Sequence, residues 1–215
     1  FLLSPANCSG RRAEILLSER ATFDLAARLR SGDGVALGDA FAFVSGLYFK
    51  GKLAYALEFS RPPEPGLPLT ASGALVITPT AGLRPAETAV TVEALRAFAT
   101  VDIAAHDPRY RKPLVESARA VAGEIGPECE VVLLGSIASA KYVDVLIDVF
   151  GDRLLFPTEF VGRGDMSRGG LMLRCVRDGE ELAYAPVKGA VRHGPRPPKL
   201  PPLRGITTHF LRRGG

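Results

Sequence analysis

The chain has 215 residues, of which 47% are apolar and 23% are charged. This length is enough for one domain with a substantial core, and the composition excludes a largely disordered or fibrous chain. The longest apolar runs, such as residues 131–134, are far shorter than the roughly 20 residues of a membrane helix, and no stretch of signal-peptide type opens the sequence. We therefore expect a cytoplasmic protein without a membrane partner.

The supply of cysteine and histidine limits the chemistry. Cys8, Cys129 and Cys175 are odd in number and widely spaced, which argues against a disulfide framework and against a tetrahedral zinc site. Two of the three histidines lie in the last thirty residues, so a catalytic histidine base is not favoured. The sequence indicates neither a metal nor an organic cofactor.

The net charge of +4 is concentrated at the C-terminal end. Residues 186–215 contain six prolines, no acid and seven cations: Lys188, Arg192, Arg196, Lys199, Arg204, Arg212 and Arg213. Residues 1–185 therefore have 20 basic and 23 acidic side chains, a net charge of −3. Because the prolines prevent a helix, we expect a folded domain over residues 1–185 and an extended basic arm over 186–215. Such an arm could bind phosphates, or it could lie solvated against an acidic body.

The first predicted element is a buried strand that ends at Leu3, and a polar loop follows it. Helical spacing covers residues 11–32, with an interruption at 18–22, and then residues 35–59, with interruptions at Gly46 and Gly51. Further along, strands are predicted at 73–78, 130–134, 153–156 and 184–187, loops at 79–85 and 157–165, and helices at 91–100, 110–125, 141–150 and 167–176. This alternation predicts an α/β fold with a mixed or mostly parallel central sheet of four to six strands flanked by helices.

Open α/β sheets bind ligands where loops leave the carboxyl ends of their strands. Four polar loops could occupy that place, at residues 4–12, 78–85, 135–142 and 162–170. The last combines Arg163 and Arg168 with four glycines ahead of a helix, a pattern that suits a phosphate. The same loop also fits a plain structural interpretation, in which Asp165 or Ser167 caps the helix and Gly169-Gly170 permits close packing.

The candidate catalytic residues are Asn7 and Asp165, each of which could orient an attacking water. The candidate residues for binding nucleic acid or phosphate are Arg11, Arg12, Tyr48, Lys50, Lys52, Arg84, Ser136, Lys141, Tyr142, Arg163, Ser167 and Arg168. Tyr48 with its two neighbouring lysines suits stacking on a base and holding a phosphate, although a helix with buried rings and solvated lysines fits equally well. Cys8 is expected to have a turn role, because the sequence places no base near it.

Five short motifs follow one another along the chain. They are Leu2-Leu3-Ser4-Pro5-Ala6, Tyr48-Phe49-Lys50-Gly51-Lys52, Thr80-Ala81-Gly82-Leu83-Arg84-Pro85, the strand, loop and tyrosine of residues 131–142, and Arg168-Gly169-Gly170-Leu171-Met172. In these motifs and in their order the chain resembles the peroxide-stress protein YaaA family and its poorly characterised bacterial relatives over residues 2–176. It departs from the family at Asn7, where a lysine is usual, so no role of that lysine is inherited. Residues 177–215 have no counterpart.

The resemblance implies an α/β domain with a positively charged cleft, DNA binding, and a link to the protection or repair of DNA under oxidative stress. It also suggests kinship with base-excision enzymes. We therefore expect a nucleic-acid-binding protein, for DNA or alternatively RNA, and a glycosylase-type hydrolase that flips a base into a pocket.

Two alternatives remain open. The chain could be an enzyme that acts on a small phosphorylated metabolite, with residues 162–170 as the anion site. It could also be a non-enzymatic module that docks on a protein partner through its proline-rich tail.

Overall fold

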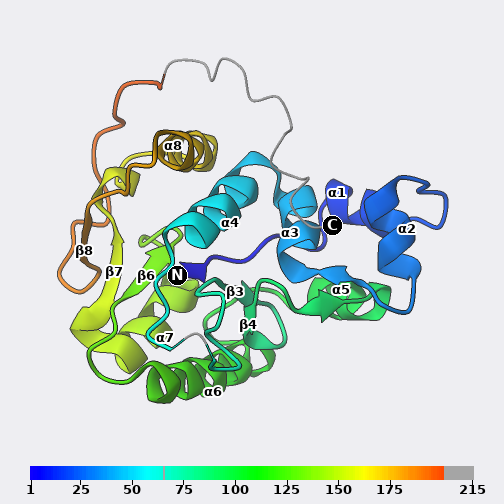
Figure 1. The fold of residues 1–215 in the computed structure, drawn as a ribbon, viewed down its shortest axis with the longest axis horizontal. Helices are drawn as coiled ribbons and strands as arrows, with labels where there is room; N and C mark the ends of the chain where they lie inside the picture. Colours follow the sequence, from blue (N-terminus) through cyan, green and yellow to red (C-terminus); the bar gives the residue numbers. More distant parts are fainter. Residues whose placement is uncertain (65, 201–215) are drawn as a thin grey trace.

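The computed structural model describes residues 1–64 and 66–200, and its centre is a mixed six-stranded sheet (Figure 1). The strands are β1 (Leu2–Leu3), β3 (Leu75–Thr78), β4 (Gly82–Pro85), β6 (Val131–Leu134), β7 (Leu154–Pro157) and β8 (Tyr184–Pro186). Their order in the sheet is β4-β3-β1-β6-β7-β8. The four central strands are parallel, and the two edge strands, β4 and β8, are antiparallel to their neighbours. The predicted α/β class and mostly parallel sheet are confirmed.

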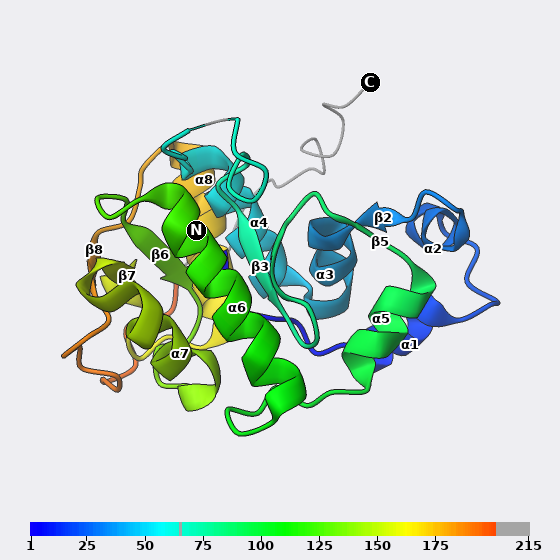
Figure 2. The ribbon, with the colours of Figure 1, turned by 90° about the horizontal axis from the view of Figure 1, so that it is seen from below.

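Helices cover both faces of this sheet. They are α1 (Arg11–Leu17), α2 (Asp24–Arg30), α3 (Leu37–Ser45), α4 (Leu47–Phe59), α5 (Val92–Ala99), α6 (Pro108–Ile125), α7 (Ala140–Phe150) and α8 (Asp165–Asp178), with short 3-10 turns η1 (Gly151–Arg153) and η2 (Thr158–Phe160). Figures 1 and 2 show α4 and α8 on one side of the sheet and α6 and α7 on the other. Over the described ranges, no helix is both long enough and apolar enough to cross a membrane.

The remaining helices, α1, α2, α3 and α5, form a lobe at one end of the molecule (right in Figure 1). A small antiparallel pair of strands, β2 (Val35–Ala36) and β5 (Ala89–Val90), belongs to this lobe. The two strands were not predicted, because two residues are too few to show a period in the sequence.

Alternation along the strands divides the interior into two cores. Leu3, Val76 and Leu134 belong to the core beneath α4 and α8. Leu2, Leu75 and Leu133, which lie side by side in the register of the sheet, belong to the core above α6 and α7. Because side chains alternate between the faces and both faces are covered, each strand is a continuous apolar run in the sequence.

Helices α4 and α8 cross with their backbones in contact. A Cβ atom on Gly169 would lie 2.7 Å from the carbonyl oxygen of Leu47, and one on Gly51 would lie 2.6 Å from the carbonyl oxygen of Gly169. The close packing expected at Gly169 is therefore present. Gly51, which we expected to interrupt a helix, lies inside α4 and makes this crossing possible.

The structure corrects two loop predictions. Residues 82–85, predicted as loop, form β4, and the positive φ of Gly82 (68°) allows the tight turn from β3. In the glycine-rich segment 162–170, α8 already begins at Asp165. Its N-cap is Gly164, and no side chain caps it, so the predicted capping by Asp165 or Ser167 is wrong.

The first residues of the predicted basic arm pack on the sheet. Pro186 belongs to β8, and Val187 is fully buried, with its N–H donating to the carbonyl oxygen of Leu154 at 2.8 Å. Residues 191–200 contain no helix or strand. The rest of the predicted arm, residues 201–215, lies outside the described residues.

Candidate functional site

Ser4 and Lys52 meet at the carboxyl end of the central strand β1. Ser4 directly follows this strand, and its N–H donates to the carbonyl oxygen of Leu134 at 3.2 Å. Lys52 reaches it from α4 and donates from Nζ to the Ser4 carbonyl oxygen at 2.6 Å and to Ser4 Oγ at 2.8 Å. Lys52 is 1% exposed and Ser4 is 6% exposed, so the pair is almost entirely removed from water.

Aromatic rings enclose the Lys52 amine. Nζ lies 4.5 Å from the ring centre of Tyr48, one helical turn earlier in α4, and 4.6 Å from that of Phe49. The rings favour a cation, but they supply no counter-charge. Among the described residues, no ion pair includes Lys52.

Burial lowers the pKa of Lys52 to about 7. The nearby carboxylate of Asp165 opposes this shift, and the positive charge of Arg168 adds to it. An ordinary lysine is fully protonated at neutral pH, whereas a pKa near 7 leaves about half of the amines neutral there. Lys52 can therefore accept a proton under conditions in which a surface lysine cannot.

Tyr48 contributes a buried hydroxyl to the same place. Within the described part of the chain this hydroxyl makes no hydrogen bond. Burial raises the pKa of Tyr48, and the neighbouring Arg168 guanidinium partly opposes that rise. The phenol is therefore protonated at neutral pH and is an unused hydrogen-bonding group.

Tyr142 and Gly135 border Ser4 on the side of β6. The Tyr142 hydroxyl accepts from the Ser136 N–H at 3.0 Å and donates to the Ser136 carbonyl oxygen at 3.1 Å. A Cβ atom on Gly135 would lie 2.8 Å from Ser4 Cβ and 3.0 Å from the Tyr142 hydroxyl oxygen. Glycine at position 135 therefore leaves room for the Ser4 and Tyr142 side chains to lie close together.

Arg168 adds a fixed positive charge from α8. Its Nε and Nη2 donate to the Phe160 carbonyl oxygen at 3.2 and 3.0 Å, and its guanidinium lies 5.5 Å from the Phe160 ring centre. Nη1 lies 3.5 Å from a carboxylate oxygen of Asp165. The Arg168 side chain is 11% exposed and the Asp165 side chain is 66% exposed. The carboxylate is therefore largely in contact with solvent, and the guanidinium is largely buried.

Ser4, Tyr48, Lys52, Tyr142 and Arg168 form one cluster, and a pocket of about 400 Å³ opens beside it. Its lining includes Ser4, Asn7, Phe98, Asp102, Lys141 and Tyr142. Asn7 is exposed at the rim, and its Oδ1 accepts from the N–H and hydroxyl of Ser9 at 3.0 and 2.8 Å. The pocket therefore joins a buried serine and tyrosine to an exposed amide and an exposed lysine.

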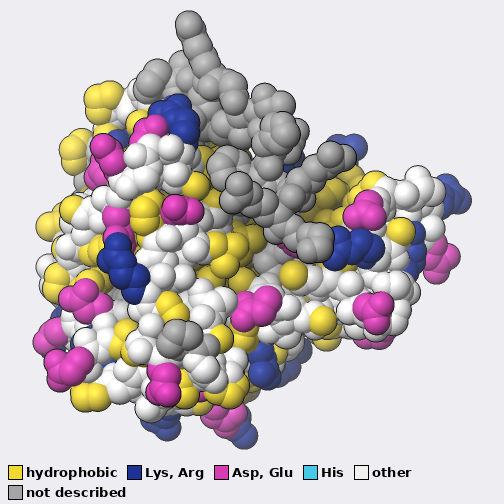
Figure 3. All heavy atoms as spheres, viewed as in Figure 1, with side chains coloured by type: hydrophobic (Ala, Val, Ile, Leu, Met, Phe, Trp, Pro, Cys, Tyr) yellow, Lys and Arg dark blue, Asp and Glu magenta, His cyan; other side chains and the backbone are white. Residues whose placement is uncertain are grey.

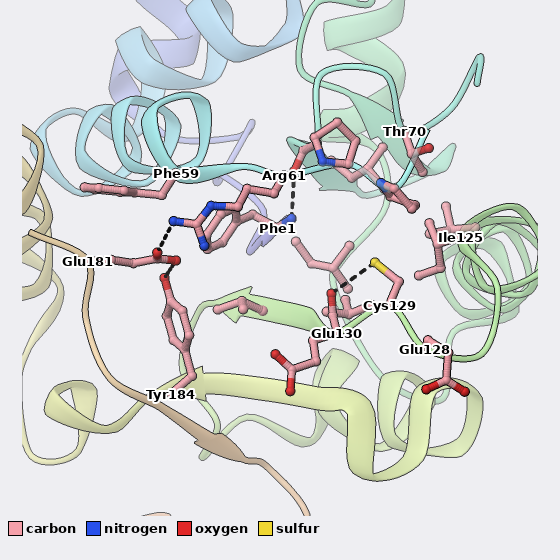
Figure 4. Close-up of a pocket in the computed structure, with 18 of the residues that line it drawn as sticks. Phe1, Phe59, Arg61, Thr70, Ile125, Glu128, Cys129, Glu130, Glu181 and Tyr184 are labelled. Atoms are coloured by element: carbon pink, nitrogen blue, oxygen red, sulfur yellow. Dashed lines mark hydrogen bonds and ion pairs between the residues drawn. The ribbon is translucent and has the colours of Figure 1, made fainter. Parts of the chain in front are cut away.

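A larger pocket, of about 780 Å³, lies at the opposite, amino-terminal ends of the strands (Figure 4). Glu128, Glu130 and Glu181 line it together with Arg61, whose Nη2 is bound to Glu181 at 2.9 Å. Because acidic side chains predominate, this pocket does not suit a phosphate. None of the predicted site residues lines it.

The structure brings together about half of the predicted site residues. Tyr48, Lys52, Ser136, Tyr142, Asp165 and Arg168 lie in or beside the cluster, and Asn7 and Lys141 lie on the neighbouring pocket.

The others are dispersed or engaged elsewhere. Arg11, Lys50 and Arg84 are exposed on α1, α4 and β4. Arg12 donates to the Phe43 carbonyl oxygen at 3.5 Å. Arg163 donates to the Glu159 carbonyl oxygen at 2.9 Å and to the hydroxyl of Ser167 at 3.4 Å.

Sequence reasoning did not single out Ser4. Its available signal was its position as the first polar residue after a buried strand, which places it at the carboxyl edge of the sheet. Cys8 behaves as expected, because burial raises its pKa to about 12 and its thiol is therefore protonated at neutral pH.

Comparison with protein-family models, with curated proteins and with solved structures gave no match to this chain.

Proposed function

We propose that this protein binds nucleic acid, DNA in the first place, and that it is a base-excising hydrolase of glycosylase type linked to DNA protection or repair. The main support is the position of the 400 Å³ pocket, which adjoins the Ser4, Lys52 and Tyr142 cluster at the carboxyl edge of the sheet. This edge is where open α/β sheets bind their ligands, and the volume suits a single nucleoside-sized group.

In this proposal the pocket receives a flipped nucleotide. Lys141, exposed on the lining, holds a flanking phosphate. Asn7 orients the attacking water with its amide N–H, since its Oδ1 is already engaged by Ser9. The water oxygen bonds to C1′ of the sugar, the bond from C1′ to the base breaks, and the proton that the water gives up goes to the departing base. Asp165 does not line this pocket and has no part in this step.

Binding is tested by titrating labelled single- and double-stranded DNA and RNA at about 50 mM and about 200 mM salt. We expect DNA affinity to fall steeply with salt, because each neutralised phosphate releases counterions. Lys141→Ala should reduce the slope of log affinity against log salt by about 0.9, the value for one phosphate. The control is Lys112→Ala, which removes an exposed cation of α6 that does not line the pocket and should leave the slope unchanged.

Absence of affinity for any nucleic acid, even at the lower salt concentration, would remove the proposal. Tight binding of a mononucleotide or sugar phosphate, with only a shallow salt dependence, would instead support an enzyme for small phosphorylated metabolites. Base release from a DNA that binds is then measured by chromatography of the free base, and Asn7→Ala should slow it.

A further inference from the structure

The contact between Ser4 and Lys52 has the geometry of a nucleophile and its base. The hydroxyl oxygen of Ser4 lies 2.8 Å from Lys52 Nζ, within the hydrogen-bond distance that proton transfer requires. A neutral lysine amine keeps two N–H bonds and a lone pair. One N–H then remains on the Ser4 carbonyl oxygen at 2.6 Å, and the lone pair can accept the proton of the Ser4 hydroxyl.

The surroundings of Lys52 favour this neutral form. The amine is buried among the rings of Tyr48 and Phe49. It has no ion-pair partner among the described residues, and the nearest charges that act on it are those of Asp165 and Arg168, which oppose each other. A purely structural role would be served better by an apolar side chain, because burial of an uncompensated ammonium is costly.

The position of Ser4 gives its hydroxyl a substrate space. Ser4 lines the 400 Å³ pocket together with Asn7, Lys141 and Tyr142, whereas Lys52 lies behind Ser4 and does not line it. A ligand in the pocket therefore meets the serine first, and the lysine acts through it.

We propose that Ser4 is an activated nucleophile with Lys52 as its general base, and that this pair hydrolyses small carboxylic esters in the pocket. Serine–lysine pairs of this kind are a recurring variant of the serine–histidine arrangement. The inference goes beyond nucleic-acid binding and does not require it.

The reaction balances without a cofactor. The Ser4 hydroxyl oxygen bonds to the carbonyl carbon of the ester while its proton moves to Lys52 Nζ. The bond from carbon to the alcohol oxygen then breaks, and the departing alcohol takes the proton from Nζ. Water next attacks the acyl group on Ser4 and gives a proton to Nζ. Ser4 leaves, recovers that proton, and releases the carboxylic acid.

The experiment uses the full chain and a fluorophosphonate probe, which bonds to activated serine oxygens with loss of fluoride. We expect labelling at Ser4, located by mass spectrometry of the digested protein, and hydrolysis of p-nitrophenyl acetate. Ser4→Ala should abolish both. Lys52→Met, which keeps the length of the side chain but removes the base, should slow labelling by about 100-fold or more, as expected for loss of a general base.

Ser31→Ala is the matched control, because Ser31 is an exposed serine outside the pocket whose hydroxyl donates to the Arg28 carbonyl oxygen rather than contacting a lysine. It should label at the wild-type rate. If Lys52→Met does not fold, the wild-type labelling rate against pH replaces it and should rise between about pH 6 and about pH 8 as Lys52 loses its proton.

The proposal is overturned if the folded wild-type chain is not labelled at Ser4 near pH 8, or if folded Lys52→Met is labelled as fast as the wild type. DNA affinity of Ser4→Ala distinguishes the two proposals. If Ser4→Ala is not labelled but binds DNA as the wild type does, the esterase pair and the nucleic-acid site are separate. If the wild type is labelled at Ser4 but binds no DNA, the esterase proposal holds and the nucleic-acid proposal fails.

Discussion

The burial of Lys52 has a cost that depends on pH. In the unfolded chain this lysine has its ordinary pKa of about 10.4, and in the folded chain burial lowers the pKa to about 7. Between these values the unfolded chain binds more protons than the folded one. Lys52 therefore makes the folded state more stable as pH rises through this window, and that stabilisation is lost as pH falls towards about 7.

Replacement of Lys52 by methionine should remove this dependence. We expect the unfolding free energy of the wild type, relative to Lys52→Met, to increase by about 1.4 kcal/mol for each pH unit between about pH 7.5 and about pH 9.5. Urea denaturation of both proteins at several pH values measures the difference, and the other titrating groups cancel in the comparison. A difference that stays constant over this range would mean that Lys52 has an ordinary lysine pKa in the folded protein.

At the residue scale the sequence predicted part of the site. Tyr48 and Lys52 were candidates, but they were grouped with Lys50, and the structure leaves Lys50 exposed while it buries the other two. Helical geometry explains this, because residues four apart share a face and residues two apart do not. The partner of Lys52 could not be predicted, since Ser4 lies 48 positions away and meets it only through packing of α4 on the sheet.

At the element scale, the crossing of α4 and α8 determines where Arg168 lies relative to Lys52. The two helices approach until the backbone of Gly169 contacts that of Leu47 and Tyr48. Arg168 precedes this contact by one residue and Tyr48 is part of it. Any shift that separates the helices therefore also moves the fixed cation away from the buried amine.

We expect Gly169→Ala to destabilise the fold by about 1–3 kcal/mol, because the new methyl group would overlap backbone atoms that cannot rotate away. Urea denaturation gives the change. The control is Gly123→Ala in α6, where a Cβ meets nothing within 4 Å; it should stabilise by about 0.5–1 kcal/mol through helix propensity alone. If both substitutions change the unfolding free energy in the same direction, the close crossing of α4 and α8 does not determine the effect of Gly169→Ala.

The elements that sequence predicted well are those with a long internal pattern. Helix α6 and strand β6 agree with the predicted ranges within two residues, because each is apolar with a clear period. Strand β4, Gly82–Pro85, has a glycine and a proline that are typical of turns, and it is a strand because β3 offers it a partner. Helix α8, predicted at 167–176, also agrees within two residues at each end, because it covers Asp165–Asp178.

At the scale of the whole molecule, the charge is divided between body and arm. On the face seen in Figure 3, acidic and basic side chains are interspersed. The arm supplies an excess of cations, and its described part passes close to the site, since Gly194 and Pro195 lie against Val161 and Gly162 in the loop that leads into α8. The arm could therefore direct a polyanion towards the carboxyl edge of the sheet.

Removal of residues 191–215 tests this role. The truncation deletes six cations and leaves a chain of net charge −2, while it retains β8 and the buried Val187. We expect the melting temperature to stay close to that of the full chain, and DNA affinity to fall together with its salt dependence, because fewer counterions are released. A truncation from residue 186 also removes Val187 from the core above α6 and α7, and it should clearly lower the melting temperature. Unchanged DNA affinity in the shorter deletion would assign the arm to another partner and leave nucleic-acid contacts to the body alone.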